Sequence, residues 1–379
     1  MTDAKNRFDL HELAGAFGDL GTLIPFVVAY VSILKMDPAS LFLGFGAVLI
    51  AAGFYYRTPF PVQPMKAIGA AAVTQTTGLI TLTSTMVVGA GLVTALIWLF
   101  LGVTGLAKRL SAWIPKPALL GVVMGLGFSF MLEGIRMMSE HLALSAGLLV
   151  LTLGLLARSR FPAMLMLLFA GSVIALIQQP TLFSDLSLIK PALRLPIFAW
   201  PSLAWQDIWM GAVLLALPQL PLTFGNALIA ITEENNRLFP DRPVTERKVA
   251  ISTGLLNLWS SALGGIPMCH GAGGMAGHVK FGARTGGASI MLGALLLLVG
   301  LFLADSVGTL FRLFPPYVLG VILFLAGTEL AMGSRDPGPE KESRFIVLAT
   351  AAFAVMNVGV AVIFGFAAHH AAKQGWLKV

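Results

Sequence analysis

The stretches PFPVQPMK at 59–66 and GGIPMCHG at 264–271 interrupt two apolar regions of the chain. Proline removes a backbone donor and disfavours helix in the residue before it, so neither stretch is fit to begin a helix early. We expect an extended segment followed by a half-helix at each place. Inside a membrane, non-helical backbone persists only where it is buried in protein or lines a cavity. The two stretches are therefore expected to line a cavity.

The composition indicates a membrane protein. Of the 379 residues, 57% are hydrophobic and 11% are charged, whereas soluble domains carry about a quarter charged residues. A water-soluble enzyme is excluded on this ground. The net charge of +7 comes from basic residues that stand singly or in pairs, which does not indicate nucleic-acid binding. The single cysteine, Cys269, excludes an intrachain disulfide and a multi-cysteine metal site.

Apolar runs bounded by charges, proline or glycine predict fourteen membrane-spanning segments. They cover 13–33, 39–56, 64–80, 85–106, 115–135, 141–157, 161–178, 206–232, 247–264, 270–282, 286–304, 314–333, 343–357 and 359–372. With a cytoplasmic N-terminus, 19 of the 25 Lys and Arg residues fall on the cytoplasmic side of the membrane. Five fall on the opposite side, and Lys66 lies within a segment. The positive-inside rule thus predicts a multi-pass protein of the cell (inner) membrane with both termini cytoplasmic. The N-terminus lacks a cleavable signal pattern and is expected to be retained.

An internal repeat divides the chain into halves. PALLGV at 117–122 recurs as PYVLGV at 316–321, which is 199 residues later. A repeat of seven segments is odd and must be inverted in the membrane. We therefore predict an all-α fold with a 7+7 inverted repeat: 1–178 holds segments 1–7, 179–205 is an external linker, and 206–379 holds segments 8–14. The binding site of such a protein lies between the halves near the midplane.

Half-helices in segments 3 and 10 would aim their amino ends at each other. These ends carry unpaired N–H groups and about half a positive charge each, which favours an anion. Lys66 is the one basic residue inside a segment, so we interpret it as functional, with snorkelling to the interface as the alternative. Asp19 is a candidate to neutralise Lys66 in the empty site or to accept a coupling proton, with a helix cap as its alternative.

Further polar residues extend this candidate site. In segment 8, Gln219, Thr223 and Asn226 fall on one helix face, which we interpret as facing the site, with structural helix–helix bonding as the alternative. Pro218 and Pro221 are expected to loosen the backbone. For Gln63 and His270 a structural role in holding the broken backbone remains open. The predicted binding set is Asp19, Thr22, Gln63, Met65, Lys66, Ala67, Gln219, Thr223, Asn226, His270, Gly271, Ala272 and Gly273. No catalytic residue, metal site or cofactor is predicted.

The motifs PVQPMKA at 61–67 and PMCHGAGG at 267–274, with FGARTGG at 281–287, resemble the two signature motifs of the molybdate transporter family, which is related to the SulP sulfate permeases. The resemblance covers nearly the whole chain, including GDLGT at 18–22. It implies the uracil-permease-like fold, with segments 1–4 and 8–11 as core, segments 5–7 and 12–14 as gate, and segments 1, 3, 8 and 10 holding the substrate. The cytoplasmic STAS domain of SulP proteins is expected to be absent.

The resemblance implies a secondary-active transporter of a tetrahedral oxyanion, with molybdate first and sulfate as an alternative. A proton-coupled nucleobase carrier of the same fold would need buried carboxylates, and segment 8 has none before Glu233. An intramembrane enzyme is disfavoured because Cys269 and His270, adjacent in an extended run, point to opposite sides. The expected partners are the oxyanion and the lipid bilayer, with no nucleic acid. The coupling ion and a homodimer stay open.

Because both halves contribute to the site, we expect alternating access by an elevator-like rigid-body motion of segments 1–4 and 8–11. The glycines at 121, 125, 127 and 320 are expected to lie on the static side of the sliding interface, where small residues let helices approach closely.

Overall fold

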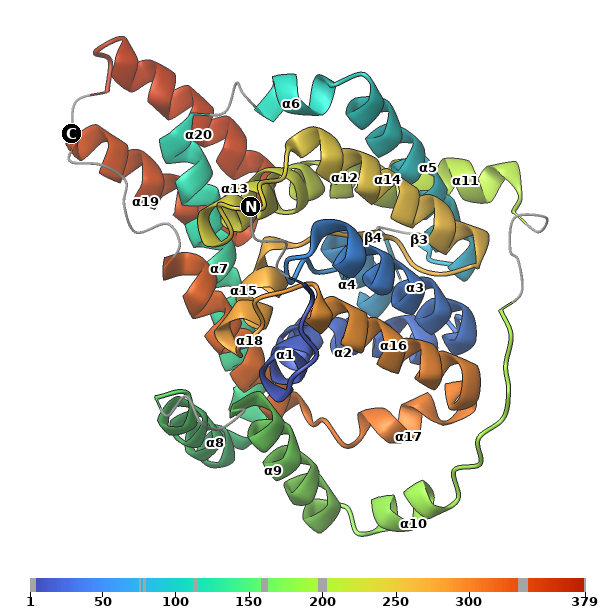
Figure 1. The fold of residues 1–379 in the computed structure, drawn as a ribbon. Helices are drawn as coiled ribbons and strands as arrows, with labels where there is room; N and C mark the ends of the chain where they lie inside the picture. Colours follow the sequence, from blue (N-terminus) through green and yellow to red (C-terminus); the bar gives the residue numbers. More distant parts are fainter. Residues whose placement is uncertain are drawn as a thin grey trace.

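The computed structural model describes residues 5–74, 76–77, 80–111, 115–157, 163–196, 203–332 and 340–377. Parts of the expected segments 64–80, 161–178 and 314–333, and of the linker 179–205, lie outside these residues. The described chain is mostly helical, with four strands of two residues each (Figure 1). A helix lies in each of the fourteen ranges expected from the sequence, although several ranges contain more than one helical element.

The first half contains α1 (Leu10–Ala16), the 3-10 turn η1 (Phe17–Asp19), α2 (Leu20–Val28), the π-turn η2 (Ala29–Ile33), α3 (Pro38–Tyr56), β1 (Gln63–Pro64), α4 (Lys66–Thr74), β2 (Thr76–Thr77), β3 (Ile80–Thr81), α5 (Ser84–Val103), α6 (Leu106–Ser111), α7 (Lys116–Met138), η3 (Ser139–His141), α8 (Leu142–Leu156), α9 (Ala163–Gln178) and α10 (Thr181–Ser187). The side chain of Asp9 caps α1 by accepting from two backbone N–H groups, and Asp37 caps α3 in the same way from Ser40.

The second half contains α11 (Trp205–Gly211), the π-turn η5 (Ala212–Ala216), α12 (Leu217–Phe224), the π-turn η6 (Gly225–Ala230), α13 (Ile231–Leu238), α14 (Glu246–Ala262), β4 (Met268–Cys269), α15 (Ala272–Lys280), α16 (Gly287–Phe302), η7 (Ala304–Ser306), α17 (Val307–Phe311), α18 (Pro316–Met332), α19 (Lys341–Met356) and α20 (Val358–Lys373). The expected segment 206–232 is thus interrupted twice by π-turns. Proline breaks the regular helical ladder, and Pro218 and Pro221 lie between these turns.

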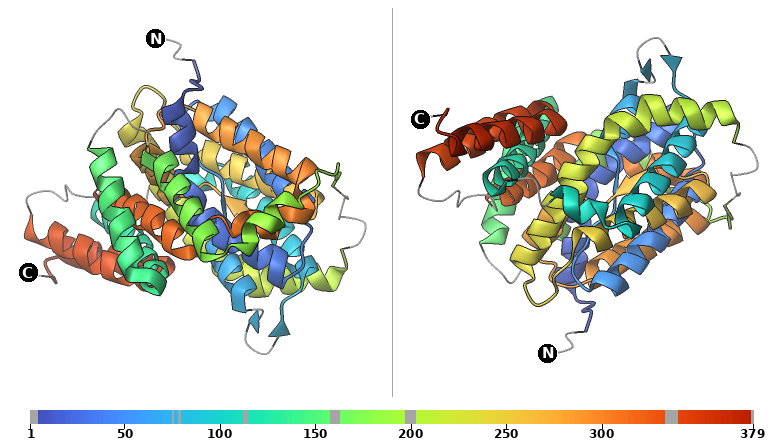
Figure 2. Two further views of the ribbon diagram at one scale, coloured as in Figure 1. Left: turned by 90° about the horizontal axis from the view of Figure 1, so that it is seen from below. Right: turned by 90° about the horizontal axis from the view of Figure 1, so that it is seen from above.

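The helices pack in two groups that lie side by side in every view (Figures 1 and 2). In the first group α3 packs along α16, α5 along α14, and α11 against α5. In the second group α7 is central and packs against α18, α19 and α20, while α8 and α9 join it through α18. The groups meet where α18 contacts α2 and α15. Sequence-distant helices therefore pair throughout the molecule.

The outer surface is apolar. Phe169, Ile177 and Ile363 are 68%, 72% and 71% exposed, which suits contact with lipid rather than water. Among the described residues, four helical segments are long and apolar enough to cross a membrane unaided: Leu10–Ser32, Pro38–Tyr56, Ser84–Val103 and Lys116–Leu156. Three further pairs pass this test when each bent pair is taken as one span, with bends of 109°, 42° and 93°. The fourteen-crossing count remains a prediction.

The two interrupted stretches meet at a strand pair. β1 and β4 run antiparallel, with Gln63 opposite Cys269 and Pro64 opposite Met268. The sequence indicated extended backbone at both places but not that one stretch would satisfy the other. Asn257 of α14 adds to the pairing, because its side chain accepts from the Met268 N–H at 2.8 Å and donates to the Met268 carbonyl at 2.7 Å. Each strand leads into a nine-residue helix, α4 or α15.

The glycines expected at the sliding interface belong to the second group but pack against other helices of that group, so the expectation that they line the interface is wrong. A Cβ at Gly121 or Gly125 would clash with α19, at Val347 and Ala351. A Cβ at Gly320 would lie 2.6 Å from the carbonyl oxygen of Gly134, within the contact between α18 and α7. These glycines therefore hold the second group together. The sequence shows that a close approach is needed but does not show which helix approaches.

We expect Gly320→Val to destabilise the protein, because the added atoms collide with the α7 backbone and overpacking of this kind costs about 1–3 kcal/mol. Gly147→Val is the matched control, since a Cβ there meets nothing within 4 Å. Thermal unfolding of the purified protein in detergent should show a melting temperature several degrees lower for Gly320→Val than for the control. Equal shifts in the two variants would contradict the close α7–α18 contact.

Candidate functional site

The candidate site lies where the strand pair opens into α4 and α15. The backbone N–H of Met65 donates to the carbonyl of Pro267 at 2.9 Å, which continues the pairing up to the first turn of α4. Because the strands are antiparallel, the two helices leave the pair at opposite ends. Each helix brings the partial positive charge of its amino end to this region. The first-turn residues Ala272 and Gly273 are buried there.

A polar cluster joins the first segment to β1. The side-chain amide nitrogen of Gln63 donates to Asp19 at 2.5 Å and to the Thr22 hydroxyl oxygen at 2.9 Å. The Thr22 hydroxyl in turn bonds to the Asp19 carboxylate. All three side chains are buried, so the structure brings these three predicted residues together. Gln63 Oε1 is buried and has no hydrogen-bond partner in the structure.

The Lys66 ammonium lies next to this cluster without an acceptor. Its Nζ is buried and has no hydrogen-bond partner, and it sits 3.5 Å from the centre of the Phe130 ring. Phe130 belongs to α7 of the second helix group, so the contact crosses between groups. An ammonium held in a protein interior without a hydrogen-bond acceptor is costly, and a cation–π contact compensates this only in part.

Glycines at the start of α15 allow the close approach. A Cβ at Gly271 would overlap Gln63 Oε1 and lie 3.3 Å from the Asn226 amide nitrogen. A Cβ at Gly273 would enter the Phe130 ring, and one at Gly274 would lie 2.8 Å from Asp19. Any larger residue at Gly271 or Gly273 would therefore collide with Gln63 or with Phe130. Asn226 Oδ1, from η6, is also buried and unpartnered.

Gln219 and Thr223 bond to each other and, through Gln219, to α4, so they do not present free polar groups to the site. Gln219 accepts from the backbone N–H of Ala67 at 2.7 Å and donates to the Thr223 hydroxyl at 2.9 Å. The Ala67 N–H is thus already occupied, and both side chains are buried. These residues tie α12 to the first turn of α4, so we interpret them as positioning the site.

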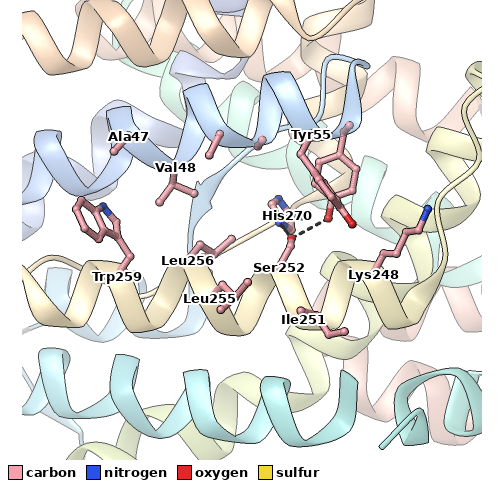
Figure 3. A pocket seen from close by; sticks show the side chains of 13 residues that line it. Ala47, Val48, Tyr55, Lys248, Ile251, Ser252, Leu255, Leu256, Trp259 and His270 are labelled. Atoms are coloured by element: carbon pink, nitrogen blue, oxygen red, sulfur yellow. Dashed lines mark hydrogen bonds between the residues drawn. The ribbon is translucent and has the colours of Figure 1, made fainter. Parts of the chain in front are cut away.

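The His270 side chain is also occupied. Its Nδ1 donates to the Pro61 carbonyl at 2.8 Å, and its Nε2 bonds to the Ser252 hydroxyl. The Tyr56 hydroxyl donates to Ser252 at 2.7 Å, which completes a chain from α3 through α14 to the backbone before β1. Figure 3 shows His270 and Ser252 beside each other. Of the two roles that the sequence left open for His270, these contacts favour the structural one.

Sequence reasoning missed Phe130. It lies in the expected segment 115–135, which was assigned to the gate, and nothing in the apolar run around it distinguishes this ring from its neighbours. Only the packing of α7 against the first group brings it to Lys66. The residues that face one another are therefore Asp19, Gln63, Lys66, Phe130 and Asn226, around the glycines that begin α15.

Comparisons with known sequences identify the family. The family model described as Molybdate transporter of MFS superfamily matches residues 11–130 and 211–330. Molybdate transporter 2 of Arabidopsis thaliana is 33% identical, over 93% of this chain and 85% of its own length. Molybdate transporter 1 of Arabidopsis thaliana is 29% identical, over 95% and 87%, and Molybdate transporter 1 of Chlamydomonas reinhardtii is 28% identical, over 93% and 89%.

Solved structures identify the fold. The transmembrane domain of a cyanobacterial bicarbonate transporter, BicA, matches with a TM-score of 0.56 and 20% identity, over 93% of this chain and 97% of that domain. Murine SLC26A9, an anion transporter in the inward-facing state, matches with a TM-score of 0.63 and 12% identity, over 99% of this chain and 70% of that protein. The chain therefore belongs to the molybdate transporter family and is a multi-pass membrane anion transporter with the fold of the BicA and SLC26 transmembrane regions.

Proposed function

We propose that the chain carries a tetrahedral oxyanion, with molybdate as the cargo, and binds it between Lys66, Asn226 and the amino end of α15. The observation that carries this proposal is the buried Lys66 ammonium without an acceptor. An oxyanion would supply the missing acceptor and would also meet the backbone N–H groups of a helix start. The names of the curated relatives support molybdate.

The charges at the site suit a dianion that arrives together with a proton. Lys66 contributes one positive charge and the amino ends of α4 and α15 about half a charge each, which gives about +2. Asp19, bonded to Gln63 and Thr22, reduces this to about +1 when it is ionised. Protonation of Asp19 would restore about +2 and balance a dianion. Asp19 is therefore our candidate for the coupling-proton site of a secondary-active carrier.

Sulfate is the first alternative cargo, because it shares the shape and charge of molybdate. A proton-coupled nucleobase carrier is the second. A nucleobase would need buried acceptors for its N–H groups, and the unpartnered oxygens of Gln63 and Asn226 are the groups that favour it. The ammonium of Lys66 beside them favours an anion instead, since a neutral ring would leave that charge unpaired.

The transport mechanism that we propose is an elevator in a 7+7 inverted repeat, with half-helices in segments 3 and 10. The two family matches begin 200 residues apart, close to the offset of the PALLGV and PYVLGV repeats. The first helix group, segments 1–4 and 8–11, would move as one body against the second, segments 5–7 and 12–14. Most helix contacts lie within a group, which supports rigid-body motion. Both termini would lie in the cytoplasm, in a protein of the inner membrane.

We expect Lys66→Met to weaken molybdate binding by about tenfold to a hundredfold, because a hydrogen bond to a charged group is worth about 1.5–3 kcal/mol. The variant should fold as well as the wild type, since it removes an unpaired charge. Uptake of radiolabelled molybdate into proteoliposomes measures the effect, and unlabelled sulfate, uracil and bicarbonate serve as competitors. Lys190→Met, on an exposed stretch, is the matched control.

Unchanged molybdate affinity in folded Lys66→Met would overturn the proposed site. Competition by uracil but not by sulfate would replace the oxyanion with a nucleobase. Competition by sulfate as strong as that by unlabelled molybdate would make sulfate a cargo as well.

We expect the affinity for molybdate to rise as the pH falls, because a proton on Asp19 adds one positive charge to the site. In Asp19→Asn this side chain is neutral at every pH, so the affinity should no longer change with pH between mildly acidic and neutral conditions. Titration of purified protein with molybdate at several pH values measures both slopes. A pH slope retained in Asp19→Asn would place the proton on another group.

We expect a disulfide between the two helix groups to stop transport. In a Cys269→Ser background, Gly21→Cys with Leu323→Cys joins α2 to α18, since a Cβ at Gly21 lies 3.1 Å from that of Leu323. Gly300→Cys with Phe42→Cys is the control within the first group, at 2.9 Å. Oxidation should block uptake in the first pair only, and a reductant should restore it.

Full uptake with the α2–α18 disulfide formed would show that the two groups do not slide past each other. Local gating around α4 and α15 would then replace the elevator.

A further inference from the structure

A groove runs between α3 and α14 on the side of the first helix group (Figure 3). Its volume is about 680 Å³, and the side chains that line it are mostly apolar. Two of them, Leu255 and Trp259, are 53% and 44% exposed, so the groove opens to the surroundings. Figure 3 shows Lys248 and Tyr55 at one end of the groove and Trp259 and Ala47 at the other. The groove is therefore amphipathic along its length.

The length of the groove matches one leaflet of a bilayer. Lys248 and Trp259 are eleven residues apart on α14, which corresponds to about 16 Å along a helix. The hydrocarbon core of a membrane is about 30 Å thick, so one leaflet measures about 15 Å. Helix α3 is itself long and apolar enough to cross a membrane. A lipid acyl chain lying beside α3 would therefore run along the groove.

The charge at the Lys248 end of the groove indicates the chemistry of the lipid headgroup. Lys248 is exposed, and among the described residues none of the ion pairs involves it. Basic residues at a membrane surface attract anionic lipids. A second copy of this chain seated in the groove would cover Lys248 with apolar helix and leave its charge unpaired, whereas a phospholipid supplies both an acyl chain and a phosphate.

We propose that this groove binds one anionic phospholipid from the leaflet that borders Lys248, with an acyl chain along α3 and α14 and the phosphate at Lys248. The inner wall of the groove includes Ser252 and His270, which belong to the hydrogen-bond chain that ends on the Pro61 carbonyl. A bound lipid would exclude water from this chain and stabilise the backbone that leads into β1.

The test is native mass spectrometry of the full-length protein in detergent, titrated with phosphatidylglycerol or with phosphatidylcholine of the same acyl chains. We expect one phosphatidylglycerol to bind more tightly than any further copies. Ala51→Phe fills the groove and should abolish this tight site, with Ala47→Leu as a second filling variant if the first does not fold. Ala352→Phe, on the exposed side of α19, is the control and should bind as the wild type does.

The headgroup is tested separately. Lys248→Gln should weaken phosphatidylglycerol binding roughly fivefold and leave phosphatidylcholine binding unchanged, while Lys108→Gln, an exposed lysine of α6, should change neither. Tight phosphatidylglycerol binding retained in a folded groove-filling variant would overturn the proposal. Loss of a dimer in Ala51→Phe, with lipid binding intact, would assign the groove to self-association instead. None of these readouts depends on the cargo.

Discussion

The two-residue pairing of β1 with β4 is the constraint on which the centre of this transporter depends. Backbone N–H and C=O groups that leave a helix inside a membrane need partners, and the two interrupted stretches provide them for each other. Side chains complete the set where prolines and bends leave gaps: Asn257 bonds to Met268, and His270 bonds to the Pro61 carbonyl. With the backbone satisfied in this way, α4 and α15 begin at fixed positions and their first turns face the same polar cluster.

Helix α14 holds this arrangement from one side. Asn257 and Ser260 bond to backbone on either side of Pro267, while Ser252, two turns earlier, bonds to His270. The same helix lines the groove shared with α3. A single helix thus connects the surface of this groove with the backbone of the candidate site, and it does so through neutral hydrogen bonds, which are tolerated in an apolar environment when every partner is satisfied.

The backbone conformation of this region could be predicted from the sequence, but the hydrogen-bond partners of its side chains could not. Prolines and glycines restrict their own dihedral angles, so the extended stretches at Gln63 and Cys269 could be read directly. An amide or imidazole can donate and accept, however, and its partner depends on packing. For that reason the sequence left the role of His270 open and placed Gln219 on the binding face, whereas in the structure Gln219 bonds to Ala67 and Thr223. Phe130 could not be found at all, because an aromatic residue in an apolar run carries no signal until a distant helix approaches it.

At the proposed site, the ring of Phe130 over Lys66 would set a minimum binding strength that an ion must exceed to displace the ring. An aromatic face is a weak counter-ion that carries no proton and cannot diffuse away, and its attraction for a buried cation reaches about 2 kcal/mol. A singly charged ion with few acceptor atoms gains little by displacing it. A compact dianion with four oxygens would gain much more, since in the proposed site it would also engage the helix starts. Selectivity against the abundant small anions of the cell would then arise from competition with a side chain of the other helix group.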